Sequence, residues 1–366
     1  MTTVTASRTT LNFSAGPAVL PECVLEQAAR DMLDLDGTGI GVLEHSHRGP
    51  AIDRVFDEAV ADCRAVGDIP DDFEILFLQG GASMQFAMVP MNFLPAGRTG
   101  DYVDTGSWTA KAIADGSKAG AVHTAWSGKD GGYRTLPSPG EIQWSDGAAY
   151  GWYCTNNTIY GTAWAEPPQC EAPLVADMSS DIFSRPIDWA SHDLVFAGAQ
   201  KNIGPAGVTL VIIRRSMLER ANTDLPAMLR YDIHAKKGSR YNTPPVFGVY
   251  CAGLVFKWIR SLGGLEAIAD MNRRKAAILY SAIDESNGFY SGHADPACRS
   301  LMNIPFTTPS AELDAAFIAE AAAEGMSTLK GHRSVGGIRA SIYNAFPEDG
   351  CRRLADFMAA FAASNG

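Results

Sequence analysis

The sequence is poor in charged residues and has no excess of positive charge. Charged side chains make up 19% of the 366 residues, hydrophobic side chains make up 46%, and the formal net charge at pH 7 is -11. This composition is typical of a chain that buries a core, not of a disordered one. Sequence-independent binding to nucleic acid or to an anionic membrane needs a basic face, so the charge argues against both partners. A local cluster of arginines could still bind an anionic small molecule.

Long hydrophobic runs and paired cysteines are also missing. No apolar run approaches the length that spans a bilayer. The first ten residues, MTTVTASRTT, lack the apolar segment of a secretory signal. The seven cysteines are odd in number, and no C-x-x-C pair occurs. We therefore expect a reduced, cytoplasmic compartment.

The common motifs for nucleotides and metals are absent as well. Neither G-x-x-x-x-G-K-[ST] nor G-x-G-x-x-G occurs, and GTGIG at 37–41 follows a helical pattern, so we expect it to cap that helix and form a loop. The segment HSH at 45–47 has no carboxylate or cysteine partner at ligand spacing. An anion site is therefore a better interpretation of this segment than a metal site.

Short apolar runs alternate with helical patterns along most of the chain. Runs that end in a small or polar elbow include EILFLQGGAS, DYVDTGSW, AAYGWYCTNNT, APLVADMSS and DLVFAGAQK. Helical spacing of apolar residues is found at 21–37, 51–67, 249–264, 265–283, 311–325 and 347–364, with Ser310 as an expected N-cap. This alternation predicts an α/β fold with a largely parallel sheet, followed beyond about residue 265 by a smaller α+β domain.

Polar or small residues lie at the elbows where the predicted strands end. In open α/β sheets, ligands bind outside the carboxyl ends of the strands. The residues at these ends are Gly81-Ala82-Ser83, Trp108, Thr158, Asp177 and Gln200-Lys201. Each has an ordinary explanation when taken alone: the glycine-containing segment is a strand-to-helix turn, the aspartate caps a turn, and the lysine extends into solvent.

Taken together, these residues match the needs of one cofactor. Pyridoxal 5'-phosphate requires a lysine for its Schiff base, an acid beside the pyridine nitrogen, an anion site for its phosphate and, usefully, an aromatic ring to stack on. Burial of Lys201 could lower its pKa by about 3–5 units, which would make its amine nucleophilic. The set predicts a site for pyridoxal 5'-phosphate.

Two further segments carry cations suited to an anionic substrate. EHSHRGP contains His47 and Arg48, and KGHRSVGGIRAS contains His332, Arg333 and Arg339. Arginine binds carboxylates and phosphates through a bidentate fork. The alternative is that each arginine forms a surface salt bridge or covers a helix end, and the sequence does not show that the two segments meet.

From about residue 12 to its end, the chain resembles the phosphoserine aminotransferases, which are class V aminotransferases of the fold-type I PLP enzymes. The resemblance rests on NFSAGPAVLP, SHRGP, GGASMQF, DYVDTGSW, ADMSSDIFSRPID, AGAQKNIGPAG, YNTPPVF and GHRSVGGIRASIYNA. It implies a large domain at 30–265 with a mostly parallel sheet flanked by helices, a small C-terminal domain at 266–366, and an N-terminal segment at 1–29 that packs with the small domain.

The resemblance also implies a role for each matching residue. Lys201 would form the Schiff base and act as general base and acid, and Asp177 would pair with the pyridinium nitrogen. The other cofactor contacts would be Trp108 on the ring, Thr158 near the ring hydroxyl, Ala82, Ser83 and Gln200 on the phosphate, and Asn242 and Thr243 on the phosphate of the neighbouring subunit of a homodimer. Substrate contacts would be Arg339 and Arg48 on the carboxylate, with His47, His332 and Arg333 on the phosphate.

The implied reaction is reversible transamination of O-phospho-L-serine and 2-oxoglutarate to 3-phosphohydroxypyruvate and L-glutamate in serine biosynthesis. A phosphorylated hydroxythreonine of the pyridoxine pathway is a possible second substrate. Some family members have serine where this chain has Ala15, and arginine where it has Ser83. The first departure would remove a substrate hydrogen bond, and the second would remove a phosphate contact. Residues 1–11 and the stretch SGKDGGYRTLPSPGE at 127–141 are expected to be surface.

Two other enzyme activities and one non-catalytic function remain as alternatives. A cysteine desulfurase would place a histidine where this chain has Gln200 and would need a mobile loop cysteine, for which Cys298 and Cys351 are poor candidates. An alanine–glyoxylate type of transaminase would not need the second His-Arg segment. A non-catalytic descendant that binds the cofactor should show damage at Lys201, Asp177 or the arginines, and the sequence shows none.

Overall fold

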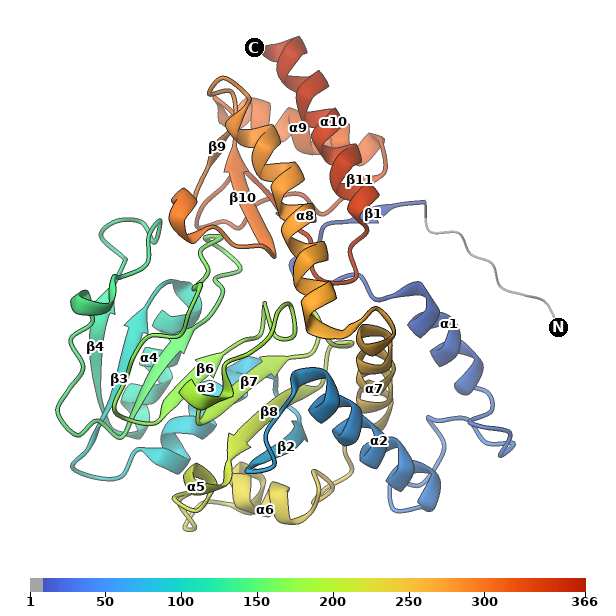
Figure 1. Ribbon diagram of the computed structural model, residues 1–366, viewed down its shortest axis with the longest axis vertical. Coiled ribbons are helices and arrows are strands. Elements are labelled where there is room, and N and C mark those ends of the chain that lie inside the picture. Colours follow the sequence, from blue (N-terminus) through green and yellow to red (C-terminus); the bar gives the residue numbers. More distant parts are fainter. Residues whose placement is uncertain (1–8) are drawn as a thin grey trace.

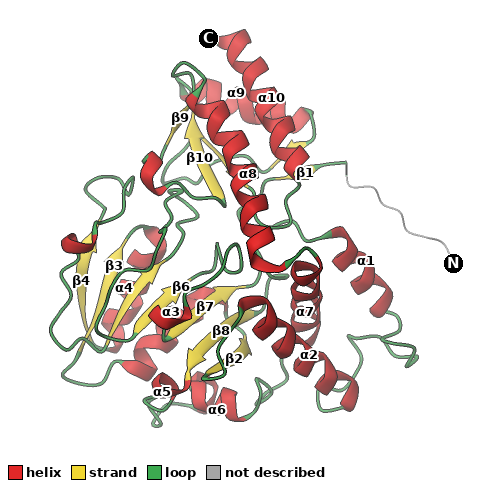
Figure 2. Ribbon diagram, viewed as in Figure 1, coloured by secondary structure: helices red, strands yellow, loops and turns green. Residues whose placement is uncertain are grey.

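The chain is built around one seven-stranded sheet. The structure is a computed structural model and describes residues 9–366 (Figures 1 and 2). The order of the strands in this sheet is β2-β8-β7-β6-β5-β3-β4, and only β8 runs against its neighbours. The strands are β2 Phe73–Leu78, β3 Thr99–Asp104, β4 Ala121–Ser127, β5 Tyr150–Cys154, β6 Leu174–Asp177, β7 Leu194–Gly198 and β8 Thr209–Arg214.

Both faces of this sheet are covered, which explains why its strands are near-continuous apolar runs. Ile75 and Phe77 face α2 Pro50–Gly67 and α7 Val246–Ser261 on one side. Leu76 and Leu78 face α3 Gly81–Phe93, α4 Ser107–Ala119, α5 Arg215–Leu218 and α6 Tyr231–Lys236 on the other. Successive side chains of a strand point to opposite faces, so a strand between two helical layers is apolar at most positions. The predicted α/β fold with a mostly parallel sheet is confirmed.

A second core lies above the sheet in Figure 1. It contains the antiparallel sheet β12-β10-β9 and the short parallel pair β1-β11. The elements of this region are β1 Leu11–Asn12, α8 Gly264–Asp284, β9 Ser291–Gly292, β10 Asn303–Thr307, α9 Ala311–Ala323, β11 Met326–Ser327, β12 Ile338–Ser341 and α10 Glu348–Asn365. Helix α8 contacts α7 and α2 at one end of its course and α10 and β10 in the second core. The predicted domain limit at residue 29 falls inside α1, and the limit at residue 265 falls at the start of α8, which contacts both cores. These limits stay a prediction.

The N-terminal segment of the described chain joins the second core. Phe13 is fully buried there, and Leu11 packs against the same cluster. Helix α1 Glu22–Asp31 then contacts α7. The expectation that residues 1–11 are surface is wrong for Leu11, because its strand pairs with β11; residues 1–8 lie outside the described part of the chain.

Most elements expected from the sequence are present, with Ser310 as the N-cap of α9 through its bond from the Leu313 amide. Helix α1 ends at Asp31, before the end of the 21–37 pattern, and the rest of that pattern forms turns that include Gly37 with its positive φ. The stretch 127–141 is not simply surface: Tyr133 is buried, donates a hydrogen bond to Asp104 Oδ2 at 3.0 Å and packs on Tyr160. Glycines and prolines around Tyr133 concealed this contact.

Among residues 9–366, no single helix is both long and apolar enough to cross a membrane. Helices α7 and α8 meet that test only when taken together, by length and composition alone, and the pair is bent by 83° at its break.

Candidate active site

The predicted elbows meet along one edge of the large sheet. Strands β2, β3, β5, β6 and β7 run in the same direction, so their carboxyl ends lie at the same edge. The segments that leave these ends carry Ala82 and Ser83, Trp108, Thr158, Asp177, and Gln200 with Lys201. In Figure 1 the second core stands over this edge.

Lys201 lies in the turn after β7, with its amine directed toward the loop after β5. Its Nζ donates a hydrogen bond to Thr158 Oγ1 at 2.8 Å, which is the one hydrogen bond of this amine in the described structure. Burial lowers the pKa of Lys201, partly opposed by the negative charge of Asp177, whereas the positive charge of Arg339 lowers it further. The amine is therefore pushed toward its neutral, nucleophilic form.

Asp177 is the last residue of β6, the strand beside β7. Its side chain is buried, and the Ser179 amide donates to Oδ1 at 2.9 Å. Burial raises the pKa of Asp177, and the bonds from Ser179 and the charge of Lys201 oppose the rise. No basic side chain of residues 9–366 forms an ion pair with this carboxylate. A buried carboxylate without a cation is costly, so the site leaves room for a positively charged partner.

A second acid, Asp181, lies one turn beyond Asp177 and was missed by the sequence reasoning. Thr155 joins the two acids: its hydroxyl is bonded to Asp181 Oδ1, and its amide and hydroxyl lie 3.1 and 3.2 Å from the carbonyl oxygen of Asp177. Burial raises the pKa of Asp181 to about 6. The only sequence signal was its position inside ADMSSDIFSRPID.

The N-terminal segment covers Lys201 from the other side. The Ala18 amide donates to the carbonyl of Gln200 at 2.8 Å, and Tyr343 Oη donates to the carbonyl of Ala15 at 2.8 Å. A Cβ at Gly16 would lie 3.5 Å from the side-chain carbons of both Gln200 and Lys201, at a positive φ. A Cβ at this distance would make only ordinary van der Waals contact, so glycine is favoured here by its φ of 137° and not by lack of space. The segment NFSAGP thus lies against Gln200 and Lys201 and closes the site instead of forming a separate arm.

The glycine-containing turn before α3 forms the open end of the site. Gly81 has φ 64° and nothing within 4 Å of a Cβ built on it. The start of α3 directs backbone N–H groups toward this space, which suits an anion. Ala82 is partly buried and Ser83 is exposed. Gln200, partly buried, comes from the neighbouring turn after β7.

Asn242 and Thr243 lie beside the same turn of their own chain. Asn242 Nδ2 donates to Gln79 Oε1 at 3.4 Å, and Gln79 Nε2 donates to the carbonyl of Thr243 at 3.2 Å. Met84 and Met228 line the same small pocket as Asn242, and both are exposed, as is the adjacent Tyr241. The structure therefore places Asn242 and Thr243 beside the turn that precedes α3, next to an exposed apolar surface.

Trp108 belongs to an aromatic cluster that joins the two cores. Its members are Trp108, Tyr133, Ile159, Tyr160 and Val335. The indole N–H of Trp108 is buried and has no hydrogen-bond partner within residues 9–366. Such an orphaned donor beside a partly exposed ring indicates that the ring faces a space meant for another group.

The second His-Arg segment approaches this site through Arg339. Arg339 Nη1 donates to the carbonyl of Thr158 at 3.3 Å, and burial lowers the pKa of Arg339. His332 accepts the Ser334 amide at Nδ1, and its carbonyl accepts the Val335 amide, so the loop 332–336 is folded against the aromatic cluster. Arg333 is exposed. None of these three basic side chains forms an ion pair with a described carboxylate.

The first His-Arg segment is not brought to the Lys201 cluster within one chain. His47 and Arg48 lie in the connection between α1 and α2, two helices that stand on the right of Figure 1. Arg48 Nε lies 3.3 Å from His47 Nε2, and its amide lies 3.3 Å from Ser46 Oγ. Neither side chain bonds to any other described part of the site.

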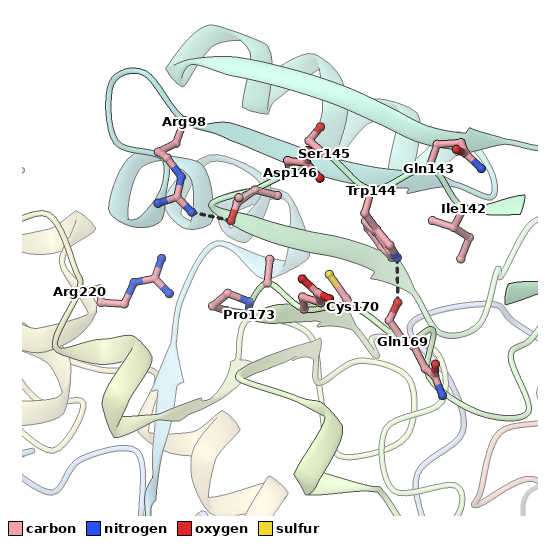
Figure 3. A pocket seen from close by; sticks show the side chains of 14 residues that line it. Arg98, Ile142, Gln143, Trp144, Ser145, Asp146, Gln169, Cys170, Pro173 and Arg220 are labelled. Atoms are coloured by element: carbon pink, nitrogen blue, oxygen red, sulfur yellow. Dashed lines mark hydrogen bonds between the residues drawn. The ribbon is translucent and has the colours of Figure 1, made fainter. Parts of the chain in front are cut away.

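A cavity at the opposite edge of the sheet is separate from these residues. Its volume is about 880 Å³, and Figure 3 shows Arg98 and Arg220 at one end and Trp144 and Gln169 at the other. The guanidinium groups donate to the carbonyls of Ala148 and Ala149. This cavity contains no pair comparable to Lys201 and Asp177. Within the described chain, no group of His, Cys, Asp and Glu side chains is placed to hold a metal ion.

The carboxyl edge fits the cofactor that the resemblance implies. It provides a desolvated amine at Lys201, an unpaired buried acid at Asp177, an open helix start at Gly81 and an aromatic ring with an orphaned donor at Trp108. Within residues 9–366, Asp177 has no ion-pair partner, the Trp108 N–H has no acceptor, and the Lys201 amine has a single hydrogen bond. These four features match the needs of pyridoxal 5'-phosphate.

Comparison with known proteins gives the same family. The model of the class V aminotransferases matches residues 10–354. A phosphoserine aminotransferase of Herpetosiphon aurantiacus is 52% identical over 359 residues, covering 98% of this chain and all of that protein. The solved phosphoserine aminotransferase from Bacillus circulans subsp. alkalophilus is 49% identical with a TM-score of 0.96, covering 98% of this chain and 100% of that one. A PLP-bound phosphoserine aminotransferase from Trichomonas vaginalis is 39% identical with a TM-score of 0.89, covering 96% and 99%.

Proposed function

Because the chain belongs to the class V aminotransferases, and within them to the phosphoserine aminotransferases, we propose that it is a PLP-dependent transaminase of serine biosynthesis. It transfers the amino group reversibly between O-phospho-L-serine and 2-oxoglutarate, and so forms 3-phosphohydroxypyruvate and L-glutamate. A phosphorylated hydroxythreonine is a further substrate that the same cationic site could accept.

One observation carries the proposal. A desolvated lysine and a buried, unpaired aspartate lie at the ends of neighbouring parallel strands. Arg339 approaches them from the second core, on the same segment as two more basic side chains without carboxylate partners, Arg333 and His332. An amine site beside a strongly cationic site suits an amino acid with a second anionic group.

The residues that would hold pyridoxal 5'-phosphate come from five elements. Lys201 and Gln200 follow β7, Asp177 ends β6, Thr158 follows β5, Trp108 begins α4, and Ala82 and Ser83 begin α3. When bound, the cofactor supplies a carbonyl for amine exchange and an electron-withdrawing ring for the substrate Cα. Asp177 would keep the ring nitrogen protonated, since its buried carboxylate favours a cationic partner.

Lys201 then serves as the base for the substrate. Burial lowers the pKa of its amine, so a larger fraction of Nζ is free to accept a proton from the substrate Cα. Thr158 Oγ1 holds this amine at 2.8 Å and orients it. The main chain at Ala15 and Gly16 closes over the lysine and limits the access of water.

The cations bind the substrate through its two acidic groups. Arg339 would grip the α-carboxylate, because it bonds to the loop that holds Lys201 through the carbonyl of Thr158. His332 and Arg333 would bind the phosphate, or the side-chain carboxylate of glutamate in the other half-reaction.

The absorption spectrum of the purified protein with pyridoxal 5'-phosphate tests this function. O-phospho-L-serine should remove the band of the bound cofactor, and 2-oxoglutarate should restore it. L-alanine and L-cysteine serve as controls and should leave the band unchanged. A parallel titration with the phosphorylated hydroxythreonine tests the second substrate.

Each other outcome points to a different function. A response to L-alanine would retain the fold and cofactor and replace the substrate, and a response to L-cysteine would indicate a desulfurase. The cysteines argue against the latter: Cys351 is buried, with a pKa raised by burial to about 12, and burial also raises the pKa of Cys298. No band at all would reject the role of Lys201.

The active form is proposed to be a homodimer in the cytoplasm. The apolar surface around Asn242 and Thr243 suits a second copy. His47 and Arg48, which lack partners in their own site, would then complete the site of that copy. All seven cysteines are free, as a reducing compartment requires. Sedimentation velocity of the Tyr241→Asp variant, which should shift the protein toward monomer, tests the assembly.

A further inference from the structure

Lys111 is a cation at the active site that the preceding assignment leaves without a role. It lies on α4 one turn after Trp108, on the same face of the helix, because residues three apart are neighbours on a helix. Its Nζ lies 4.3 Å from the centre of the Trp108 ring. No carboxylate within residues 9–366 pairs with it; the nearby Asp115 pairs instead with Lys118 at 2.8 Å.

The position of Trp108 connects Lys111 to the substrate-binding loop. Trp108 packs in the aromatic cluster with Val335, and the Val335 amide donates to the carbonyl of His332 at 2.9 Å. The amine over the ring therefore stands beside the loop 332–336. The positive charge of Lys111 also lowers the pKa of His332, together with Arg339 and Arg333, after the larger effect of burial.

Four basic groups thus converge without an anion in a chain whose net charge is -11. The positive charges of Lys111, Arg333 and Arg339 repel one another, and the contact with a partly exposed indole stabilises an ammonium by only about 0.5–1 kcal/mol. The indole holds the amine loosely, and the flexible stem of a lysine with three rotatable donors can move to an incoming anion. A phosphate dianion would remove the repulsion and would satisfy these donors.

We infer that Lys111 is a specificity-determining residue that binds the phosphate of the phosphorylated substrate from α4, opposite His332 and Arg333. The inference rests on the proposed function. A phosphate carries close to two negative charges at neutral pH, whereas the side-chain carboxylate of glutamate carries one. Lys111 should therefore favour phosphoserine over glutamate, while Arg339 serves both through the shared α-carboxylate.

Lys111→Met tests this role, since methionine keeps the length and packing of the stem and removes the charge. Single-turnover titrations of the cofactor-loaded enzyme with one amino acid at a time give a separate apparent Kd for each substrate. We expect the Kd of O-phospho-L-serine to rise about ten- to thirtyfold, as for the loss of one charge-assisted hydrogen bond. The Kd of L-glutamate should rise less than about threefold, and the inhibition constant of inorganic phosphate should rise with that of phosphoserine.

Lys118→Met is the matched control, because Lys118 lies on the same helix with its side chain 76% exposed and paired with Asp115. It should behave as the wild type, and Lys111→Arg should recover most of the phosphoserine affinity. Equal losses for both substrates, or a weaker affinity for pyridoxal 5'-phosphate instead, would overturn the inference and would make Lys111 a support for Trp108. If the wild type itself does not respond to phosphoserine, the proposed function fails. If the wild type responds and Lys111→Met binds phosphoserine with an unchanged Kd, this inference alone fails.

Discussion

Two lysines of the described chain are shielded from water, Lys275 completely and Lys201 in part, and they differ in the hydrogen bonds that the protein gives their amines. Lys201 has one acceptor for its amine, Thr158 Oγ1. Lys275, on α8, is fully buried, and its Nζ donates to three successive carbonyls, those of Ile342, Tyr343 and Asn344, at 3.0, 2.7 and 3.3 Å. Burial lowers the pKa of both amines, that of Lys275 to about 8.

The difference separates a reactive lysine from a structural one. An ammonium has three donors, and Lys275 uses all of them on the end of β12. This bonding fixes Tyr343, which holds the carbonyl of Ala15 over the site, and Asn344, whose amide donates to Asn202 Oδ1 at 3.0 Å beside Lys201. The amine of Lys201 is left with unused donors and a lowered pKa, so it is free to react. Desolvation alone does not identify a catalytic lysine; the number of its partners does.

The largest effect is expected where the reactive lysine is removed. Lys201→Ala should lower turnover by at least about a thousandfold, because neither the covalent attachment nor the base remains. The melting temperature of the cofactor-free protein should stay unchanged or rise, since the variant loses only one hydrogen bond and a desolvated amine. After borohydride reduction, mass spectrometry should find the cofactor on the peptide with residue 201 in the wild type alone. A variant that keeps a tenth of the activity would contradict the role.

Lys275→Met should produce the opposite result. Three buried carbonyls lose their donor, so the free energy of unfolding should fall by about 3 kcal/mol, measured by urea titration. The exposed neighbour Arg273, which pairs only with Asp270 on the same helix, provides the control. Arg273→Met should change stability by less than about 0.5 kcal/mol. Full stability of Lys275→Met combined with lost covalent attachment of the cofactor would reverse the assignment of the two lysines.

The smallest expected effect is a pH dependence of the free energy of unfolding, which arises from the titration of Lys275. Its pKa is about 8 in the folded chain against an ordinary value of 10.5, so the unfolded chain binds more protons between these values. Stability from this group therefore rises with pH through this window, by at most about 1.4 kcal/mol per pH unit. The difference in unfolding free energy between wild type and Lys275→Met should grow from pH 7.5 to 9.5. A constant difference would show that the amine does not titrate there.

The sequence was a good guide to the strand ends and a poor guide to the groups that come from elsewhere. Asp177 and Lys201 could be selected because each follows a run of apolar residues, which is a local signal. Tyr133 was hidden in a stretch of glycines and prolines, and Asp181 gave only its place in a motif. Lys275 follows Arg273 and Arg274 in what reads as a solvated helix face, although it is the buried member of the three.

What the sequence determined by itself is the alternation of strands and helices, the polar elbows at the strand ends and the membership in a family. These features depend on neighbouring residues, whose periodicity and turn chemistry are written along the chain. The tertiary structure alone decided that loop 332–336 packs on Trp108, that Gly16 closes over Lys201, and which lysine is satisfied and which is left reactive. Burial and hydrogen bonding depend on segments far apart in the sequence, and only the folded chain brings those segments together.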